Sequence, residues 1–241
     1  MKTHIARNYL EMSSQAAELI INQVRENPNS LVCFAAGNTP LGTFSCLVEA
    51  FHGGRINFDQ CRFISLDEWV GLGASDEGSC RQTLDRHFFE PCGIKKENIH
   101  FFNGTSDELE AECKAMDDLI VAHGTIDLLL LGVGINGHLG FNEPHVDLEQ
   151  YSHVTDLDSV TKQVSVKYFT ERKNVQKGIT LGIKHLIQAS MVILIADGEK
   201  KADIMRKALR HEVTNEVPVT VMQRHPNVHV CMDESAAAFV L

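Results

Sequence analysis

Residues 126–144 read Ile-Asp-Leu-Leu-Leu-Leu-Gly-Val-Gly-Ile-Asn-Gly-His-Leu-Gly-Phe-Asn-Glu-Pro, and the rest of the chain is organised around them. Its segment 128–131 is a short, unbroken apolar run, which is typical of a central strand covered on both faces of a parallel sheet. Gly132, Gly134 and Gly137 follow, and glycines let the backbone turn tightly and approach a ligand closely. The stretch therefore predicts a buried strand that ends in a glycine-rich loop.

Three polar side chains lie in this loop, namely Asn136, His138 and Glu143. In an open parallel sheet, ligands bind beyond the carboxyl ends of the strands. A purely structural glycine turn would not explain why an amide, an imidazole and a carboxyl group gather on it. We therefore expect the chemistry of the protein to take place at this loop.

The three glycines also have the G-x-G-x-x-G spacing of dinucleotide-binding loops. In those loops a helix begins within the glycines, and its amino end faces the pyrophosphate. Here Pro144 ends any such helix after little more than one turn, and Gly140 weakens it further. The sequence therefore disfavours a dinucleotide site.

The whole chain has the composition of a folded, water-soluble domain. Its 241 residues can form one α/β domain (1–241) with a full-sized core, and 44% are hydrophobic while 22% are charged. The formal net charge of −10 argues against nucleic acid or an acidic membrane as a partner. An anionic substrate would then need locally placed cations and backbone amides.

The amino terminus contains Lys2 and Arg7 but no long apolar run, and Glu11 interrupts the next apolar segment. We therefore expect neither a signal peptide nor a transmembrane span. The seven cysteines are an odd number, are widely spread and contain no Cys-x-x-Cys motif. This pattern favours reduced thiols in the cytoplasm over disulfides or a zinc site.

Helical and strand patterns alternate along the chain, which predicts a doubly wound, mostly parallel sheet in a Rossmann-like three-layer α/β fold. Helices are expected at 10–25, 40–51, 79–89, 105–123 and 200–210, and the one after 105 is expected to start with a capping box at 105–108. Strands are expected at 31–36, 61–66, 99–102, 128–131, 191–196 and 228–231. From 145 to 177 the pattern loosens, which predicts a mobile lid over the site.

Two further strand ends carry candidate site residues. Gly37-Asn38-Thr39-Pro40 follows a buried strand, and a proline at the start of a helix after a glycine turn leaves amides that can bind an anion. An ordinary strand–helix turn explains this pattern equally well. Asp67 directly follows the strand at 61–66, where a carboxylate is also common as a simple turn or cap residue.

Residues 131–144 resemble the signature loop of the glucosamine-6-phosphate deaminase/isomerase family, with its long G-x-G-x-N-G-H-x-x-F-N-E-P form. The related 6-phosphogluconolactonases share the G-x-G-x-x-G-H core but lack the Asn-Glu-Pro ending, so residues 142–144 favour the deaminases. Residues 66–72, Leu-Asp-Glu-Trp-Val-Gly-Leu, resemble the second signature of the same family. The resemblance extends from the Gly37 loop to Lys200, and it implies a further strand at 178–183.

The resemblance implies roles for the polar residues of both motifs. His138 would move a proton at the ring oxygen and open the sugar, while Glu143 and Asn136 would hold the imidazole in its working tautomer. Asp67 would act as the base on C2. Many family members have Asp in place of Asn136, so here Glu143 must supply the acidic partner.

The resemblance also implies a phosphate site. The deaminases have a T-G-x-T-P phosphate loop where this chain has Ala-Gly37-Asn38-Thr39-Pro, so some hydroxyl contacts are lost while backbone contacts remain. Lys167-Tyr-Phe stands where many deaminases have Arg-Phe-Phe, which keeps the charge but loses the bidentate fork. Lys200 matches a family lysine that reaches the phosphate, although a lysine near a helix start is more commonly a solvated surface residue.

The implied reaction converts a 2-amino-sugar 6-phosphate and water into a ketose 6-phosphate and ammonia. Acid–base groups suffice for this chemistry, so no cofactor and no metal are expected. The expected partner is the small-molecule substrate alone, bound by a monomer or a small homo-oligomer. Glucosamine 6-phosphate is the default, yet Leu-Asp-Glu-Trp-Val and Gly-Ile-Thr-Leu-Gly-Ile-Lys also resemble the galactosamine-6-phosphate branch. A 6-phosphogluconolactonase and a non-catalytic sugar-phosphate sensor are the remaining alternatives.

Overall fold

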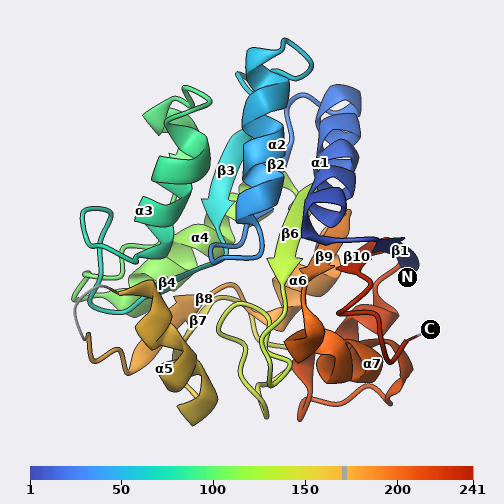
Figure 1. The fold of residues 1–241 in the computed structure, drawn as a ribbon. Coiled ribbons are helices and arrows are strands. Elements are labelled where there is room, and N and C mark those ends of the chain that lie inside the picture. The colour runs from blue at the N-terminus through green and yellow to red at the C-terminus, as the bar shows by residue number, and fades with distance from the viewer. Residues whose placement is uncertain (170–172, 241) are drawn as a thin grey trace.

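The computed structural model describes residues 1–169 and 173–240, so residues 170–172 of the expected lid lie outside the described residues. The main sheet has seven strands, in the order β1 (Lys2–Ala6), β10 (Val228–Asp233), β9 (Val192–Ala196), β6 (Leu128–Gly132), β2 (Leu31–Phe34), β3 (Arg62–Ser65) and β5 (Ile99–His100). Every neighbouring pair in it is parallel. The predicted parallel sheet is confirmed, with the apolar run of β6 at its centre (Figure 1).

Helices cover both faces of this sheet. One face carries α1 (Tyr9–Glu26), α2 (Leu41–His52) and α3 (Cys80–Leu84), which continues as the π-helical η1 (Asp85–Phe89). The other face carries α4 (Leu109–His123), α6 (Ile183–Gln188), α7 (Ala202–Arg210) and the 3-10 helix η5 (Pro218–Arg224). This is the three-layer arrangement that the sequence predicts.

The apolar run of β6 explains why two helix layers form. Successive strand residues point to opposite faces, so Leu128 and Leu130 join the core with α1 and α2, whereas Leu129 and Leu131 join the core with α4 and α6. All four side chains are fully buried. A strand buried on both faces needs apolar residues at every position, which is what the run supplies.

A second, three-stranded antiparallel sheet lies beside the main one. It consists of β4 (Asp67–Trp69), β8 (Lys177–Thr180) and β7 (His153–Asp156), with β8 in the middle. The predicted strand at 178–183 is therefore shorter than expected and belongs to this small sheet, because its partners are β4 and β7. The segment between β7 and β8 contains α5 (Ser159–Ser165) and the 3-10 helix η3 (Val166–Tyr168).

Two local predictions differ from the structure. The capping box at 105–108 is wrong, since α4 begins at Leu109 after Glu108, whose side chain makes no capping bond. Instead the Ser106 hydroxyl accepts a hydrogen bond from the Glu108 amide at 3.1 Å, which forms a local turn before the helix. The strand β1 is not predicted from the sequence, because its pattern Lys-Thr-His-Ile-Ala is short and mostly polar. It is an edge strand with exposed residues.

Short 3-10 turns complete the chain at η2 (Lys96–Asn98) and η4 (Glu199–Lys201). No helix within residues 1–169 and 173–240 is long and apolar enough to cross a membrane. All seven cysteines are free thiols. The arrowheads of β3 and β6 point to one edge of the sheet, where α5 also lies (Figure 1). That edge holds the site.

Candidate active site

A cavity of about 840 Å³ opens at the carboxyl edge of the main sheet. The loops after β2, β3, β6 and β9 contribute to it, and α5 and η3 cover part of it. Seven residues that the sequence predicts for the site line this cavity: Gly37, Asn38, Thr39, Asp67, His138, Lys167 and Lys200. The other two, Asn136 and Glu143, lie behind His138 and contact it or its backbone.

The glycines of the β6 loop make room for the imidazole. A β-carbon on Gly134 would lie about 2.4 Å from the His138 ring, so only glycine fits where the ring packs. The loop then turns tightly, with the Gly137 amide donating to the Gly134 carbonyl at 3.0 Å and Gly137 in the left-handed region at φ 89°. The glycine pattern thus positions a side chain, which explains it without a dinucleotide.

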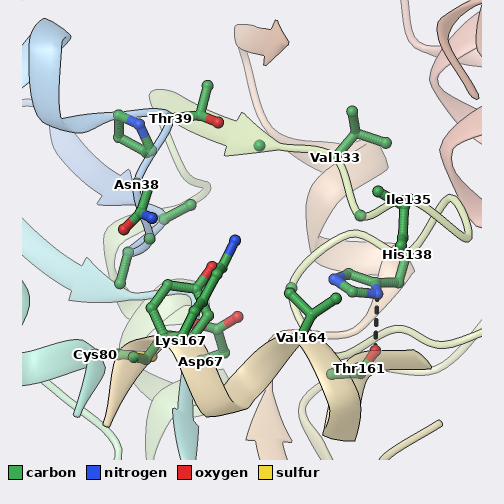
Figure 2. Close-up of a pocket in the computed structure, with 18 of the residues that line it drawn as sticks. Asn38, Thr39, Asp67, Cys80, Val133, Ile135, His138, Thr161, Val164 and Lys167 are labelled. Atoms are coloured by element: carbon green, nitrogen blue, oxygen red, sulfur yellow. Dashed lines mark hydrogen bonds between the residues drawn. The ribbon is translucent and has the colours of Figure 1, made fainter. Parts of the chain in front are cut away.

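The imidazole of His138 is held from one side. Its Nδ1 lies 3.4 Å from Glu143 Oε2 and 3.1 Å from the hydroxyl of Thr161 on α5. Asn136 donates from its side-chain amide to Glu143 Oε2 at 3.1 Å, and its side-chain oxygen accepts from the His138 amide at 3.2 Å. The other ring nitrogen points into the cavity (Figure 2). His138 therefore offers one nitrogen to a ligand and the other to the protein.

Glu143 is 7% exposed and remains the acidic partner of the imidazole. Burial raises the pKa of Glu143, but the hydrogen bond and charge of His138, with hydrogen bonds from Thr161 and Asn136, outweigh burial and hold that pKa below its ordinary value. The Asp158 amide donates to Glu143 Oε1 at 3.3 Å. These donors keep Glu143 an ionised carboxylate, which can only accept hydrogen bonds, beside Nδ1 of the imidazole.

The Asn-Glu-Pro ending of the motif also has a structural role. The buried side-chain amide of Asn142 donates to the carbonyls of Leu139 and Leu181, at 2.7 Å and 2.8 Å. These two bonds tie the β6 loop to the chain just after β8. Glu143, the next residue, is thereby fixed beneath His138.

Asp67 begins β4 and faces the same cavity from the other side (Figure 2). Burial raises the pKa of Asp67 to about 7, a hydrogen bond from the Cys80 thiol opposes the rise, and the charge of Glu68 adds to it. Gly140, at φ 58°, packs against this strand end, since a β-carbon there would lie 2.8 Å from the Thr180 hydroxyl and 3.2 Å from the Leu66 side chain. A carboxyl group with such a pKa is matched to a base that works near neutral pH.

Glu68 fixes the strand end that carries Asp67. Its carboxylate is 1% exposed and accepts hydrogen bonds at 2.9 Å from the amides of Trp69, Cys80 and Arg81. Burial raises the pKa of Glu68 to about 7, while the three amides favour its charged form. The Asp-Glu pair thus has two functions: the first carboxylate faces the cavity and the second joins β4 to α3.

The loop after β2 forms the opposite end of the cavity. The Tyr9 hydroxyl donates to the Thr39 carbonyl at 3.1 Å and accepts from the Gly42 amide at 2.7 Å, so the start of α1 holds this loop. Thr39 donates its hydroxyl to Asp197 at 2.7 Å. Among the residues that the structure describes, the amides of Gly37, Asn38 and Thr39 make no hydrogen bond, which leaves them able to bind an anion.

Three lysines line this end of the cavity. Lys167 and Lys200 are exposed, whereas Lys201 is half-buried and donates to the Val133 carbonyl at 2.5 Å. Burial, with the charge of Lys167, lowers the pKa of Lys201 to about 8, against the opposing charge of Asp197. Partial burial and Lys200 likewise lower the pKa of Lys167, with Asp197 again opposing. This end of the cavity is therefore positively charged, although the chain is acidic.

Several residues of the site lie outside the sequence predictions: Tyr9, Cys80, Asp158, Thr161 and Lys201. Lys201 follows Lys200 directly, and only its burial at the start of α7 distinguishes the two. Asp158 could have been predicted as a helix cap, because its side chain caps α5 by accepting from the Val160 amide at 2.8 Å. Nothing in the local sequence points from Thr161 to His138. Within residues 1–169 and 173–240, no three His, Cys, Asp or Glu side chains are grouped to hold a metal ion.

Comparison with known proteins shows the family of this chain. Residues 7–230 match the family described as glucosamine-6-phosphate isomerases/6-phosphogluconolactonase. A glucosamine-6-phosphate deaminase of Thermoanaerobacter pseudethanolicus is 38% identical over 241 residues, which cover 100% of this chain and 95% of that protein. One of Lachnoclostridium phytofermentans is 41% identical over 231 residues, 95% of this chain and 98% of that protein. The chain therefore belongs to this family.

Solved structures agree with that assignment. A monomeric glucosamine-6-phosphate deaminase superposes with a TM-score of 0.96 at 31% identity, covering 99% of this chain and 100% of that one. The 6-phosphogluconolactonase of Trypanosoma brucei superposes with a TM-score of 0.78 at 18% identity, covering 100% of this chain and 98% of that one. At that identity the second likeness shows the fold alone.

Proposed function

We propose that this chain is a glucosamine-6-phosphate deaminase, which converts glucosamine 6-phosphate and water into fructose 6-phosphate and ammonia. One observation carries the proposal: a buried carboxylate, Asp67, and an imidazole, His138, face one cavity whose other end is positively charged. Full-length relatives at 38% and 41% identity are named for this activity. The Asn-Glu-Pro ending, which the lactonases lack, supports the same choice.

The phosphate of the substrate is proposed to bind at the lysine-rich end. The free amides of residues 37–39 and the ammonium groups of Lys167, Lys200 and Lys201 would surround it. Amides and ammonium groups together form a phosphate site without a metal ion. Anchored there, the six-carbon sugar extends across the cavity towards His138 and Asp67.

Ring opening is assigned to His138. The nitrogen that faces the cavity accepts the proton of the anomeric hydroxyl and returns it to the ring oxygen, which breaks the bond between that oxygen and C1. Glu143 stabilises the imidazolium that exists between the two transfers. Asn136 cannot carry charge, so its role is to hold the Glu143 carboxylate and the His138 backbone in place by its two hydrogen bonds.

Asp67 is assigned to the next step. Its carboxylate removes the proton from C2 of the open sugar and returns it to C1. The carbonyl bond at C1 opens, and its oxygen takes up the proton that the amine loses, which leaves a carbon–nitrogen double bond at C2. Water then adds to C2, and ammonia leaves. Because the pKa of Asp67 is about 7, the base becomes available as the pH rises through neutrality.

Segment 159–168 is proposed to be the lid over this site. Six of its residues line the cavity: Val160, Thr161, Gln163, Val164, Lys167 and Tyr168. Trp69 packs against its end, with 6.3 Å between the ring centroids of Trp69 and Tyr168. We also propose that the enzyme acts in the cytoplasm, in N-acetylglucosamine catabolism, as a monomer or a small homo-oligomer.

The test is ammonia release from glucosamine 6-phosphate and galactosamine 6-phosphate side by side, with hydrolysis of 6-phosphogluconolactone as the third assay. The expected result is the highest kcat/KM with glucosamine 6-phosphate and no lactone hydrolysis above background. A higher kcat/KM with galactosamine 6-phosphate would reassign the sugar. Lactone hydrolysis without ammonia release would contradict the proposal, and binding without any turnover would indicate a sensor.

A further inference from the structure

The lid segment contributes a hydroxyl group to the imidazole that opens the ring. Thr161 lies in α5, outside both signature motifs, and is 3% exposed. Its Oγ1 is 3.1 Å from Nδ1 of His138, closer than the 3.4 Å between that nitrogen and Glu143 Oε2 (Figure 2). Of these two contacts to Nδ1, the shorter one is therefore made by a neutral hydroxyl from another element.

The donors and acceptors around Glu143 decide the direction of this hydrogen bond. An ionised carboxylate can only accept, and Oε2 of Glu143 lies 3.4 Å from Nδ1 of His138. The ring nitrogen beside this acceptor is the one that carries the proton, so the Thr161 oxygen at 3.1 Å from it accepts as well. Nδ1 of His138 must then be the donor, so the neutral imidazole carries its proton on Nδ1. Its other nitrogen, Nε2, has a free lone pair facing the cavity.

The same carboxylate fixes the position of α5. The amide of Asp158, the cap of this helix, donates to Glu143 Oε1 at 3.3 Å, and its side chain accepts from the Val160 amide. Asn136 contributes a longer contact to Asp158 at 3.5 Å. Oε1 of Glu143 thus holds the start of α5. Its Oε2 lies beside the imidazole that Thr161 on the same helix contacts.

We propose that Thr161 is a positioning residue for ring opening: its hydroxyl holds His138 in the Nδ1–H tautomer, so that Nε2 takes the sugar proton. This inference rests on the proposed function, because it assigns Thr161 to the ring-opening step of that reaction. Lys167 follows Thr161 on the same covering segment and lines the phosphate end. Phosphate binding therefore favours the position of the segment in which the imidazole is correctly oriented.

The first experiment replaces Thr161 by Val, which keeps the shape and removes the hydroxyl, and by Ser, which keeps the hydroxyl. We expect Thr161→Val to lower kcat by about tenfold or more, in the range that a misplaced acid–base group costs. KM should change by less than about twofold, because the phosphate contacts remain. Thr161→Ser should recover kcat to within about threefold of the unmodified enzyme.

Two controls separate positioning from folding. Thr155→Val removes a hydroxyl from β7, shortly before the covering segment, where that hydroxyl donates to the Asp156 carbonyl at 3.3 Å, and should leave kcat unchanged. The open-chain analogue 2-amino-2-deoxyglucitol 6-phosphate needs no ring opening, so Thr161→Val should bind it as tightly as the unmodified enzyme does. Equal kcat for Thr161→Val and the unmodified enzyme, or an equal loss in the Val and Ser variants, would overturn the proposal.

The second experiment reads the tautomer directly, without turnover. Long-range ¹H–¹⁵N correlation spectra of protein labelled in histidine distinguish the two ring nitrogens, and His138→Gln identifies the signals of this ring. In the unmodified enzyme Nε2 should be the unprotonated nitrogen, and Thr161→Val should shift population to the Nε2–H form. An Nε2–H imidazole in the unmodified enzyme refutes the proposal even if no variant folds. Failure of ammonia release refutes the proposed function but leaves this tautomer measurement valid.

Discussion

Replacing Asp67 by Asn should make the protein more stable while it removes the activity. Asp67 is a carboxylate that the fold places in a buried cavity beside a second carboxylate, Glu68. Burial of a charge costs free energy unless it is compensated, and the Cys80 thiol compensates only in part. Asn has almost the same shape and no charge, so the substitution should relieve this cost.

The magnitude follows from the pKa. Between the ordinary value of 3.8 and about 7, each pKa unit corresponds to about 1.36 kcal/mol, which gives about 4 kcal/mol at most. Asp67 keeps part of its surface in the open cavity, and water there reduces the effect, so we expect about 2–4 kcal/mol.

The sign follows from proton binding. Because the folded-state pKa is raised, the folded protein holds a proton that the unfolded chain has lost between pH 3.8 and about 7. The stability of the unmodified protein therefore falls as the pH rises through this window. Above it the full cost is present, and below it the cost is absent. The gain from Asp67→Asn should accordingly be large at pH 8 and near zero at pH 4.

The assay is urea unfolding of both proteins at pH 4 and pH 8. Asp107→Asn, which removes an exposed carboxylate, is the matched control and should show no such pH-dependent gain. A gain of the same size at both pH values, or a loss at pH 8, would show that the buried charge of Asp67 does not destabilise the protein. In that case Asp67 would have the ordinary pKa of an exposed carboxylate.

The same variant tests the chemistry. If Asp67 is the base on C2, Asp67→Asn should lower both ammonia release and exchange of the C2 hydrogen with deuterated water by at least about a hundredfold, near 2.7 kcal/mol. Binding of the substrate phosphate should survive, because the lysine-rich end is untouched. Exchange at the unmodified rate would show that another group is the base. A stable, inactive protein would show that the site is maintained at a cost in stability.

Three further substitutions test other parts of the site. Lys201→Met should lower kcat/KM at least about tenfold, or about 1.4 kcal/mol. Lys200→Met should lower it less, because the Lys201 ammonium is half-buried and that of Lys200 is exposed; equal losses would contradict this. Gly134→Ala should lower kcat about tenfold or more while the protein stays folded, because its β-carbon displaces the imidazole, as a crystal structure would confirm. Cys80→Ala should move the acidic limb of the kcat/KM profile to higher pH, since the thiol lowers the pKa of Asp67, whereas Cys80→Ser should not.

The main sheet could be predicted because its central strands carry a strong signal. The run Leu128–Leu131 is apolar at every position, and that pattern is specific to a strand covered on both faces. The edge strand β1 carries no such signal, since an edge strand needs few apolar residues. The small antiparallel sheet could not be predicted either. Its strands β4, β7 and β8 have only three or four residues each and pair over long separations in the chain.

The grouping of the candidate site residues was predictable where they lie next to each other in the chain. Asn136, His138 and Glu143 share one loop, and the loop motif alone identifies them. Thr161 and Asp158 reach the same imidazole and carboxylate through tertiary packing of α5, which no spacing encodes. Local sequence can identify a loop with a function, but it cannot identify the element that the fold brings against it.

The position of α5 gives the proposed lid a chemical consequence. Thr161 contacts His138, and beyond the helix Phe169 packs against Trp69 with 5.8 Å between the ring centroids. Gly78 is needed at the same place, because a β-carbon there would lie 2.3 Å from the Tyr168 carbonyl. If this segment moves away to admit the sugar, the hydroxyl leaves the imidazole at the same time. The imidazole is then oriented for ring opening only after the segment closes. A sugar without phosphate lacks the contact to Lys167, so its ring should open slowly even when it enters the cavity.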